Sequence, residues 1–174
     1  MNAGGEKVAV LGAGSWGTAL AVELATRHQV MLWGHTPAEV EAMRRDRENR
    51  HYLPGITFPS GLLVPLDLAE AIHEAREILI VVPGHAVASV CAPLAELHPA
   101  LESIAWATKG FDPASKTLLS EVATHYCPRA DLAVISGPTF AGEVAGGMPT
   151  AITVAANTES HAQHIAALLR SDNF

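Results

Sequence analysis

Short apolar runs alternate with longer segments of helical periodicity along the chain. The runs are almost wholly apolar, as in KVAVL and EILIVV, and this pattern is typical of strands buried on both faces of a sheet. Strands are expected at Lys7–Leu11, Gln29–Trp33, Glu77–Val82, Ser103–Ala107, Leu132–Ile135 and Thr150–Ala155. Helices are expected at Gly14–Arg27, Ala38–Arg47, Asp67–Ala75, Ala86–Leu97, Lys116–Tyr126 and Glu159–Arg170.

Several helix ends carry local signals. Pro37 starts one helix at a position where proline costs no hydrogen bond. Asp67 can cap the next, with Glu70 placed for the return bond of a capping box, and Thr158 caps the last. Pro93 must bend or split its helix. Residues 51–65 are rich in proline and glycine and are expected to form a loop.

Strands that alternate with helices predict a doubly wound, mostly parallel α/β sheet with helices on both faces. The length of 174 residues fits one domain. Apolar residues make up 49% of the chain and charged residues only 17%, against about 25% in an average domain. Two explanations fit this low charged fraction and are compatible: a sheet covered on both faces, and a surface that meets another domain or subunit.

The formal charge of −7 argues against nucleic-acid partners, because the phosphate backbone favours basic patches. Cys91 and Cys127 form no CxxC motif and suit a reducing compartment. The N-terminal segment MNAGGEKVAVLGAGSWG lacks the features of a signal peptide, and no run reaches the ~18 apolar residues of a membrane span. A soluble, cytoplasmic domain without membrane insertion is expected.

A complete GxGxxG motif, Gly12 to Gly17, directly follows the first predicted strand and opens a helix. In this context Gly12 permits the tight turn, Gly14 lets a pyrophosphate approach the backbone, and Gly17 lets helix and strand pack closely. The helix N-terminus then offers free N–H groups and partial positive charge to the phosphates. The motif therefore predicts dinucleotide binding by a Rossmann arrangement; the alternative is a glycine turn needed only for packing.

The end of the second strand, about 20 residues further on, sets the choice between NAD and NADP. It reads LWGHT and holds no carboxylate to accept a bond from the ribose 2′-OH. His35 can donate to a 2′-phosphate, and Thr36 would not repel it. Nearby arginines follow at positions 44, 45, 47 and 50. This favours NADP(H), with NAD(H) possible; alternatively, the arginines only solvate a helix face.

Three further strand ends carry candidates, since ligands bind outside the carboxyl ends of strands in open sheets. Pro83 and Gly84 would form a wall beside the cofactor, whereas His85 is better explained as a structural or helix-end residue than as an acid or base. Lys109 can meet a substrate phosphate or carbonyl oxygen, or be a solvated surface lysine. The turn at Ser136–Ala141 can hold an anion, cap a helix through Thr139, or do both.

The remaining candidates carry little chemistry. His161 and His164 have no third ligand at metal spacing and are expected to be surface residues, so no metal site is predicted. No lysine follows the glycine turn as in a P-loop, which excludes that class of NTPase.

Taken together, GAGSWGTALA, LWGH, VVPGHA, WATKGF and ISGPTFAGEVAGGMPTA resemble the bacterial type of NAD(P)-dependent glycerol-3-phosphate dehydrogenase, in the family's order, from about Lys7 onward. Gly84 departs from the serine common in the family, which puts one hydroxyl contact in doubt. The resemblance implies reversible hydride transfer between NADPH and dihydroxyacetone phosphate, giving sn-glycerol 3-phosphate for phospholipid synthesis. It implies cofactor contacts at Ser15, Trp16, His35, Tyr52, Lys109 and Ala141, and substrate contacts at Lys109, Gly137 and Thr139.

The family has a second, helical domain with a proton-transfer lysine, and no such motif occurs before Phe174. We therefore expect residues 1–174 to be the N-terminal cofactor domain, with no catalytic residue of its own, negligible turnover, and a homodimer as the full-length enzyme. The same residues are also compatible with a dehydrogenase of this plan that takes another substrate, with a stand-alone dinucleotide sensor, or with a flavin or adenosyl-methionine binder.

Overall fold

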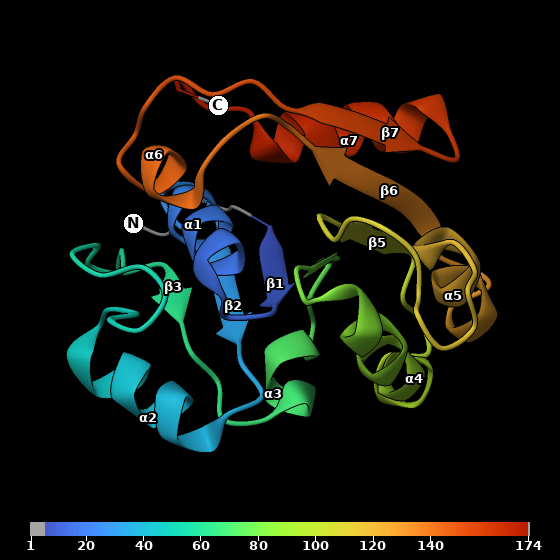
Figure 1. Cartoon of the computed structure of the whole chain (residues 1–174), viewed down its shortest axis with the longest axis horizontal. Coiled ribbons are helices and arrows are strands. Elements are labelled where there is room, and N and C mark those ends of the chain that lie inside the picture. Colours follow the sequence, from blue (N-terminus) through green and yellow to red (C-terminus); the bar gives the residue numbers. More distant parts are fainter. Residues whose placement is uncertain (1–5, 174) are drawn as a thin grey trace.

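A seven-stranded sheet in the order β3-β2-β1-β4-β5-β6-β7 organises the chain in the computed structural model, which describes residues 6–173 (Figure 1). The strands are β1 (Lys7–Leu11), β2 (Gln29–Trp33), β3 (Leu62–Leu63), β4 (Glu77–Ile80), β5 (Ser103–Trp106), β6 (Asp131–Ser136) and β7 (Thr153–Ala156). The helices are α1 (Ser15–Leu24), α2 (Pro37–Asp46), α3 (Leu68–Ile72), α4 (Val87–Leu97), α5 (Leu119–Tyr126), α6 (Ala141–Ala145) and α7 (Glu159–Leu169). The first five residues of the N-terminal segment, for which no signal peptide is expected, lie outside the described residues.

All strand pairs are parallel except β6 and β7, which run antiparallel. The central strands are buried on both faces, as their unbroken apolar runs predict. In β7, by contrast, burial alternates along the strand, because this edge strand is covered on one face only. The predicted doubly wound, mostly parallel sheet with helices on both faces is confirmed.

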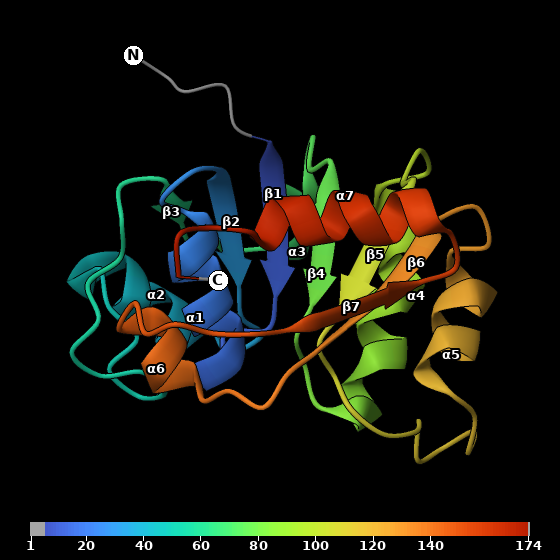
Figure 2. The ribbon, with the colours of Figure 1, turned by 90° about the horizontal axis from the view of Figure 1, so that it is seen from above.

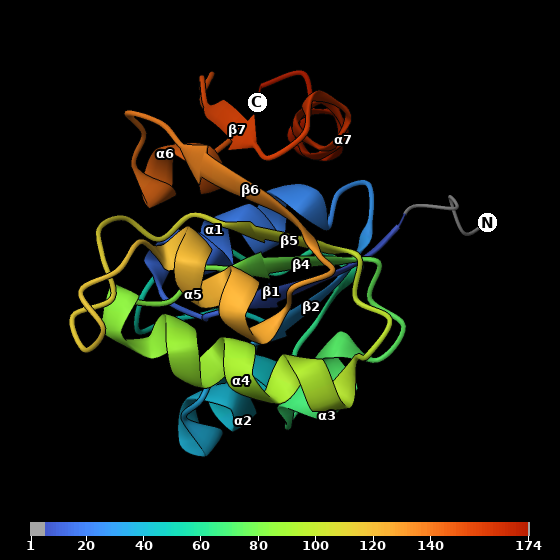
Figure 3. The same cartoon turned by 90° about the vertical axis from the view of Figure 1, so that its right-hand side faces the viewer.

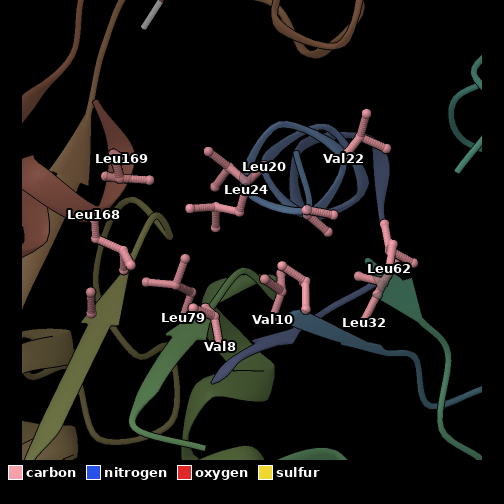
Figure 4. Packing of buried hydrophobic residues seen from close by; sticks show 14 of the residues in the cluster. Val8, Val10, Leu20, Val22, Leu24, Leu32, Leu62, Leu79, Leu168 and Leu169 are labelled. Atoms are coloured by element: carbon pink, nitrogen blue, oxygen red, sulfur yellow. The ribbon is translucent and has the colours of Figure 1, made fainter. Parts of the chain in front are cut away.

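Each face of the sheet has its own apolar core. On one face, α1 and α7 pack over β1 and β4, where Leu20 and Leu168 meet Val8 and Leu79 in one buried cluster (Figure 4). On the other face, α3, α4 and α5 pack against the sheet in a second cluster. Figure 3 shows α1 and α7 on the opposite side of the sheet from α3 and α4. The low charged fraction is accounted for in part by this double cover.

Several boundaries differ from the sequence expectations. The loop expected at 51–65 contains β3, which pairs with β2 through Val30 and Met31. α5 starts at Leu119 instead of Lys116, because Lys116 has φ +60° and belongs to a turn. β4 ends at Ile80, two residues early, and the short helix α6 has no counterpart among the expected helices.

The expected caps are mostly confirmed. Asp67 accepts a hydrogen bond from the Glu70 N–H at 2.7 Å, and Thr158 accepts one from the His161 N–H at 3.2 Å. The Glu70 carboxylate accepts the return bond from the N–H of Leu66, one residue before the expected donor. α4 continues through Pro93 without splitting.

Within the described residues, no helix is long and apolar enough to cross a membrane.

Candidate functional site

The glycine turn between β1 and α1 is shaped by close packing at two of its three glycines. Gly12 has φ +123°, and a Cβ there would lie 2.2 Å from the carbonyl oxygen of Val81. A Cβ on Gly17 would lie 1.9 Å from the carbonyl oxygen of Gly12. Both positions therefore exclude a side chain, as the motif predicts for the turn and for helix–strand packing.

Gly14 is different, because a Cβ built there meets nothing within 4 Å. It is the N-cap of α1, yet no side chain caps the helix and its first turn holds no acidic residue. The N–H groups of this turn are therefore available to an acceptor, and the helix dipole adds partial positive charge. Open space beside uncapped N–H groups is what a phosphate needs at a helix N-terminus.

The loop after α2 is fastened to this turn by Asn49, a buried residue that the sequence did not single out. Its amide nitrogen donates to the Ala13 carbonyl at 2.8 Å and to the Thr18 hydroxyl at 2.9 Å. Its amide oxygen accepts from the Tyr52 N–H at 3.2 Å. A lone asparagine in an irregular segment gives no periodic signal, so only the fold identifies its role.

The same loop also meets α1 directly. The Ser15 hydroxyl donates to the Tyr52 carbonyl at 2.7 Å, which explains how Tyr52 reaches the glycine turn. Trp16 and Ala141 pack against one small buried cluster formed by Ala19, Leu53 and Val144. Four predicted cofactor residues, Ser15, Trp16, Tyr52 and Ala141, are thus brought together around the start of α1.

The end of β2 presents an exposed His35 beside half-buried Thr36, with 3.5 Å between the Nε2 and Oγ1 atoms. The arginines that follow lie elsewhere. Arg47 donates to the carbonyls of Leu62, Phe58 and Pro59, and it therefore holds the chain around β3. Arg44 and Arg45 lie in the last turn of α2, away from His35, which precedes the start of that helix.

Arg45 and Arg50 both pair with the carboxylate of Asp46, at 2.8 and 3.5 Å. The Arg45 guanidinium lowers the pKa of Asp46 through this hydrogen bond. Arg45 and Arg50 thus have carboxylate partners of their own and Arg47 has backbone partners, which leaves His35 as the candidate donor directly at the end of β2.

The ends of β4 and β5 are tied together beside the glycine turn. The Thr108 hydroxyl donates to the Val82 carbonyl at 2.6 Å, and Pro83 and Lys109 stand on the two adjoining loops. Pro83 and Lys109 are both exposed. A Cβ on Gly84 lies 3.2 Å from the carbonyl oxygen of Phe111, so the loop after β5 packs closely on it.

That loop is organised by Asp112. Its carboxylate accepts hydrogen bonds from the N–H and the hydroxyl of Ser115, both at 2.7 Å. These bonds, first the one from the hydroxyl, lower the pKa of Asp112. The segment from Asp112 to Ser115, which follows Lys109 in this loop, therefore has a defined conformation.

The turn after β6 holds two of the predicted substrate residues. A Cβ on Gly137 would lie 2.8 Å from the Ala151 carbonyl oxygen. The backbone that approaches this glycine closely is therefore the segment around Ala151 and not a ligand. The Thr139 hydroxyl is buried and has no hydrogen-bond partner within the described residues. Phe140, and not Thr139, is the N-cap of α6. Thr139 is therefore free for a ligand, as a helix-capping hydroxyl would not be.

The histidines of α7 are not the surface residues expected from the sequence. His161 is buried, and His164 is half-buried against Glu77, with its Nε2 atom 2.7 Å from Oε1. The expectation was wrong because α7 lies across the sheet, and spacing along the helix does not reveal what the sheet brings to it.

An open α/β sheet with this glycine turn after its first strand defines a Rossmann-type domain. A family model described as the N-terminus of NAD-dependent glycerol-3-phosphate dehydrogenase matches residues 7–162. The chain belongs to this family.

Relatives cover the whole chain but extend well beyond it. A glycerol-3-phosphate dehydrogenase (NAD(P)+) of Xanthomonas oryzae pv. oryzae is 47% identical over 170 residues, which is 97% of this chain and 50% of the relative. One of Stenotrophomonas maltophilia is 47% identical and covers 100% of this chain and 52% of the relative. The solved structure of a glycerol-3-phosphate dehydrogenase from Coxiella burnetii aligns with TM-score 0.93 and 38% identity over 98% of this chain and 52% of that one. The chain thus spans about half the length of the curated relatives it matches.

Proposed function

We propose that this chain is the cofactor-binding half of a glycerol-3-phosphate dehydrogenase. The observation that carries the proposal is the open space at Gly14 beside the uncapped N-terminus of α1. There the N–H groups of the first turn hold the pyrophosphate of NAD(P)H. Gly12 and Gly17 keep the turn close enough to the sheet for those N–H groups to converge.

The walls of the proposed cofactor site come from four predicted residues around α1 and from the loop after β4. Trp16 and Ala141 supply apolar surface, while Ser15 and Tyr52 hold the loop after α2 in place. Pro83 limits the site on the side of β4. When bound, the cofactor supplies the hydride that reduces a ketone.

The substrate is proposed to be dihydroxyacetone phosphate, which would give sn-glycerol 3-phosphate for glycerophospholipid synthesis; the names of the relatives support this substrate. Lys109, exposed on the loop that Asp112 orders, offers positive charge to the phosphate or the carbonyl oxygen. Thr139 offers a buried hydroxyl without a partner within the described residues, and Gly137 keeps its turn tight.

Ketone reduction also needs a proton for the oxygen. We propose, on the family resemblance, that a lysine of a further helical domain supplies it in a cytoplasmic homodimer. Residues 1–174 would then bind the cofactor with negligible turnover. Loss of a positioned proton donor typically costs about 10²–10⁴ in rate.

The proposed preference is for NADP(H) over NAD(H). No carboxylate stands at the LWGHT segment to repel a 2′-phosphate, and His35 is exposed there and able to donate to it. Replacing His35 by alanine, which has no side-chain donor, should therefore reduce the preference for NADPH while leaving NADH binding nearly unchanged.

A fluorescence titration of the chain with NADPH, in competition with NADH, tests the proposal. We expect saturable binding that Gly14→Ala weakens at least tenfold, with the free energy of unfolding unchanged, because alanine fits there without a clash. Exposed His73, which lies after α3, provides the matched control, with His73→Ala set beside His35→Ala. Absence of binding to the folded chain would refute the phosphate site, and equal affinities for the two cofactors would refute the role of His35. Turnover comparable to that of a full-length relative would refute the half-enzyme proposal.

A further inference from the structure

A second cluster of chemical groups lies at the opposite, amino edge of the sheet. Glu6 directly precedes β1, Glu77 begins β4, and His164 lies on α7. One carboxylate oxygen from each glutamate and one ring nitrogen of the histidine all lie within 4.8 Å of one another. Figure 2 shows that α7, the last helix of the chain, crosses the sheet near the start of β1.

The cluster buries more negative charge than its own groups neutralise. Glu77 is only 3% exposed; its Oε1 atom pairs with His164, and its Oε2 atom accepts a hydrogen bond from the Ser103 hydroxyl. The Oε2 atom of Glu6 is buried, has no hydrogen-bond partner within residues 6–173, and lies 3.8 Å from the Nε2 atom of His164. One imidazole thus serves two carboxylates, and a buried carboxylate oxygen without a partner is costly.

The only other nearby cation in the described ion pairs is Arg76. Its guanidinium lies 3.8 Å from the Oε1 atom of Glu6, on the other oxygen of that carboxylate, and is itself largely exposed. It does not satisfy the Oε2 atom that faces His164. A cation placed between the three ligand atoms would do so.

We propose that Glu6, Glu77 and His164 bind a divalent transition-metal ion, of which Zn²⁺ is the best match. An imidazole nitrogen with carboxylate oxygens is a zinc ligand set, whereas Mg²⁺ and Ca²⁺ prefer oxygen alone. Tetrahedral bonds of about 2.1 Å place ligand atoms about 3.4 Å apart. The observed distances from the His164 nitrogen, 2.7 Å to Glu77 and 3.8 Å to Glu6, lie on either side of this value.

The surroundings fit such a site. The Ser103 hydroxyl orients Glu77, as hydrogen bonds to ligating carboxylates commonly do. The side chains of Glu6 and His164 are 27% and 36% exposed, so the ion can enter and a water can complete the coordination. Coordination requires a neutral imidazole, and metal binding therefore releases any proton that His164 carries.

The site would stabilise the fold and take no part in hydride transfer. It joins the segment before β1, the start of β4 and the last helix, whereas the glycine turn lies at the carboxyl ends of the strands. The metal site is therefore independent of the proposed cofactor-binding function, and NADPH binding at the other edge can be measured separately.

The test is a titration of the metal-free chain with Co²⁺, followed by visible absorbance, and with Zn²⁺, followed by calorimetry and thermal unfolding. We expect one ion per chain, Co²⁺ absorbance that Zn²⁺ displaces, and, at a hundredfold excess over the dissociation constant, about a hundredfold shift of the unfolding equilibrium towards the folded state. A chelator should reverse that shift.

Variants distinguish the site from adventitious binding. His164→Gln should abolish the effect, and Glu6→Gln should weaken binding at least tenfold while leaving the pair between His164 and Glu77 intact. The matched control is His73→Gln, since His73 and Glu74 form a largely exposed pair of the same chemistry, 4.0 Å apart. Absence of saturable binding to the folded chain overturns the proposal. So does binding that survives both cluster substitutions or that His73→Gln abolishes.

Discussion

Asn49 offers the sharpest test of how the glycine turn is held. Asn49→Ala removes two donated hydrogen bonds, to Ala13 and Thr18, and one accepted from Tyr52. At roughly 0.5–1.5 kcal/mol for each bond, the expected loss in the free energy of unfolding is about 2–4 kcal/mol. Because the residue is buried, no water takes over the lost bonds. The ratio of folded to unfolded chain should fall about a hundredfold.

A second substitution at the same position sharpens the test. Asn49→Asp keeps the acceptor for Tyr52 but loses both donations and turns a buried negative charge towards the Ala13 carbonyl oxygen. It should therefore destabilise the chain more than Asn49→Ala does, although its shape is closer to asparagine. A simple loss of volume predicts the opposite order.

The assay is urea-induced unfolding followed by circular dichroism, together with an NADPH titration of each variant below its unfolding transition. Asn157→Ala is the control. The Asn157 amide oxygen accepts a hydrogen bond from the Leu132 N–H and its amide nitrogen donates one to the Asp131 carboxylate, but the residue is exposed, so their loss should cost about 1 kcal/mol or less. If Asn49→Ala destabilises the chain no more than this control, or if NADPH affinity stays unchanged, the loop does not hold the turn as described.

Three further outcomes are expected. Gly12→Ala should lower the free energy of unfolding by more than about 3 kcal/mol in thermal melts, since its Cβ would clash with the Val81 carbonyl at a φ that alanine avoids; a stable variant would contradict the geometry of the turn. Burial, with a smaller contribution from the neighbouring Cys127, raises the pKa of the Cys91 thiol to about 12. Iodoacetamide at pH 8 should therefore label Cys91 in the urea-unfolded chain but hardly at all in the folded chain, which mass spectrometry would show. Hydrogen bonds from Ser115 lower the pKa of Asp112 in the folded state. The stabilisation that they give is complete above the ordinary aspartate pKa of about 4 and is lost as pH falls through the lowered pKa. In that pH range, amide exchange at Ser115 should accelerate relative to neighbouring amides, and Asp112→Asn should remove this pH dependence.

The central strands and the glycine turn could be predicted from the sequence because each depends on neighbouring residues. An apolar run such as Glu77–Val82 has few alternatives to a buried strand, and Gly12 and Gly17 are needed for steric reasons that the motif itself expresses. Element boundaries differ from the expectations where a distant contact decides them. β3 exists only because two residues, Leu62 and Leu63, lie beside β2.

The missed side chains share one cause. Asn49 and His161 are polar, and polar residues in a loop or on an amphipathic helix are ordinarily exposed. Each is buried here because a segment far away in the sequence packs over it: the glycine turn in one case, and the start of β5 in the other. Such burial follows from the tertiary fold and has no local signature.

The two outer strands of the sheet also bear on how the chain avoids aggregation. An exposed edge strand offers unpaired N–H and C=O groups to any other chain that can extend the sheet. Here the outer strands are β3, with two residues, and β7, with four, although the strands at the centre are almost wholly apolar. A second chain could therefore form only a few backbone hydrogen bonds at either edge, so the length of the edge strands gives protection that their uncharged side chains do not.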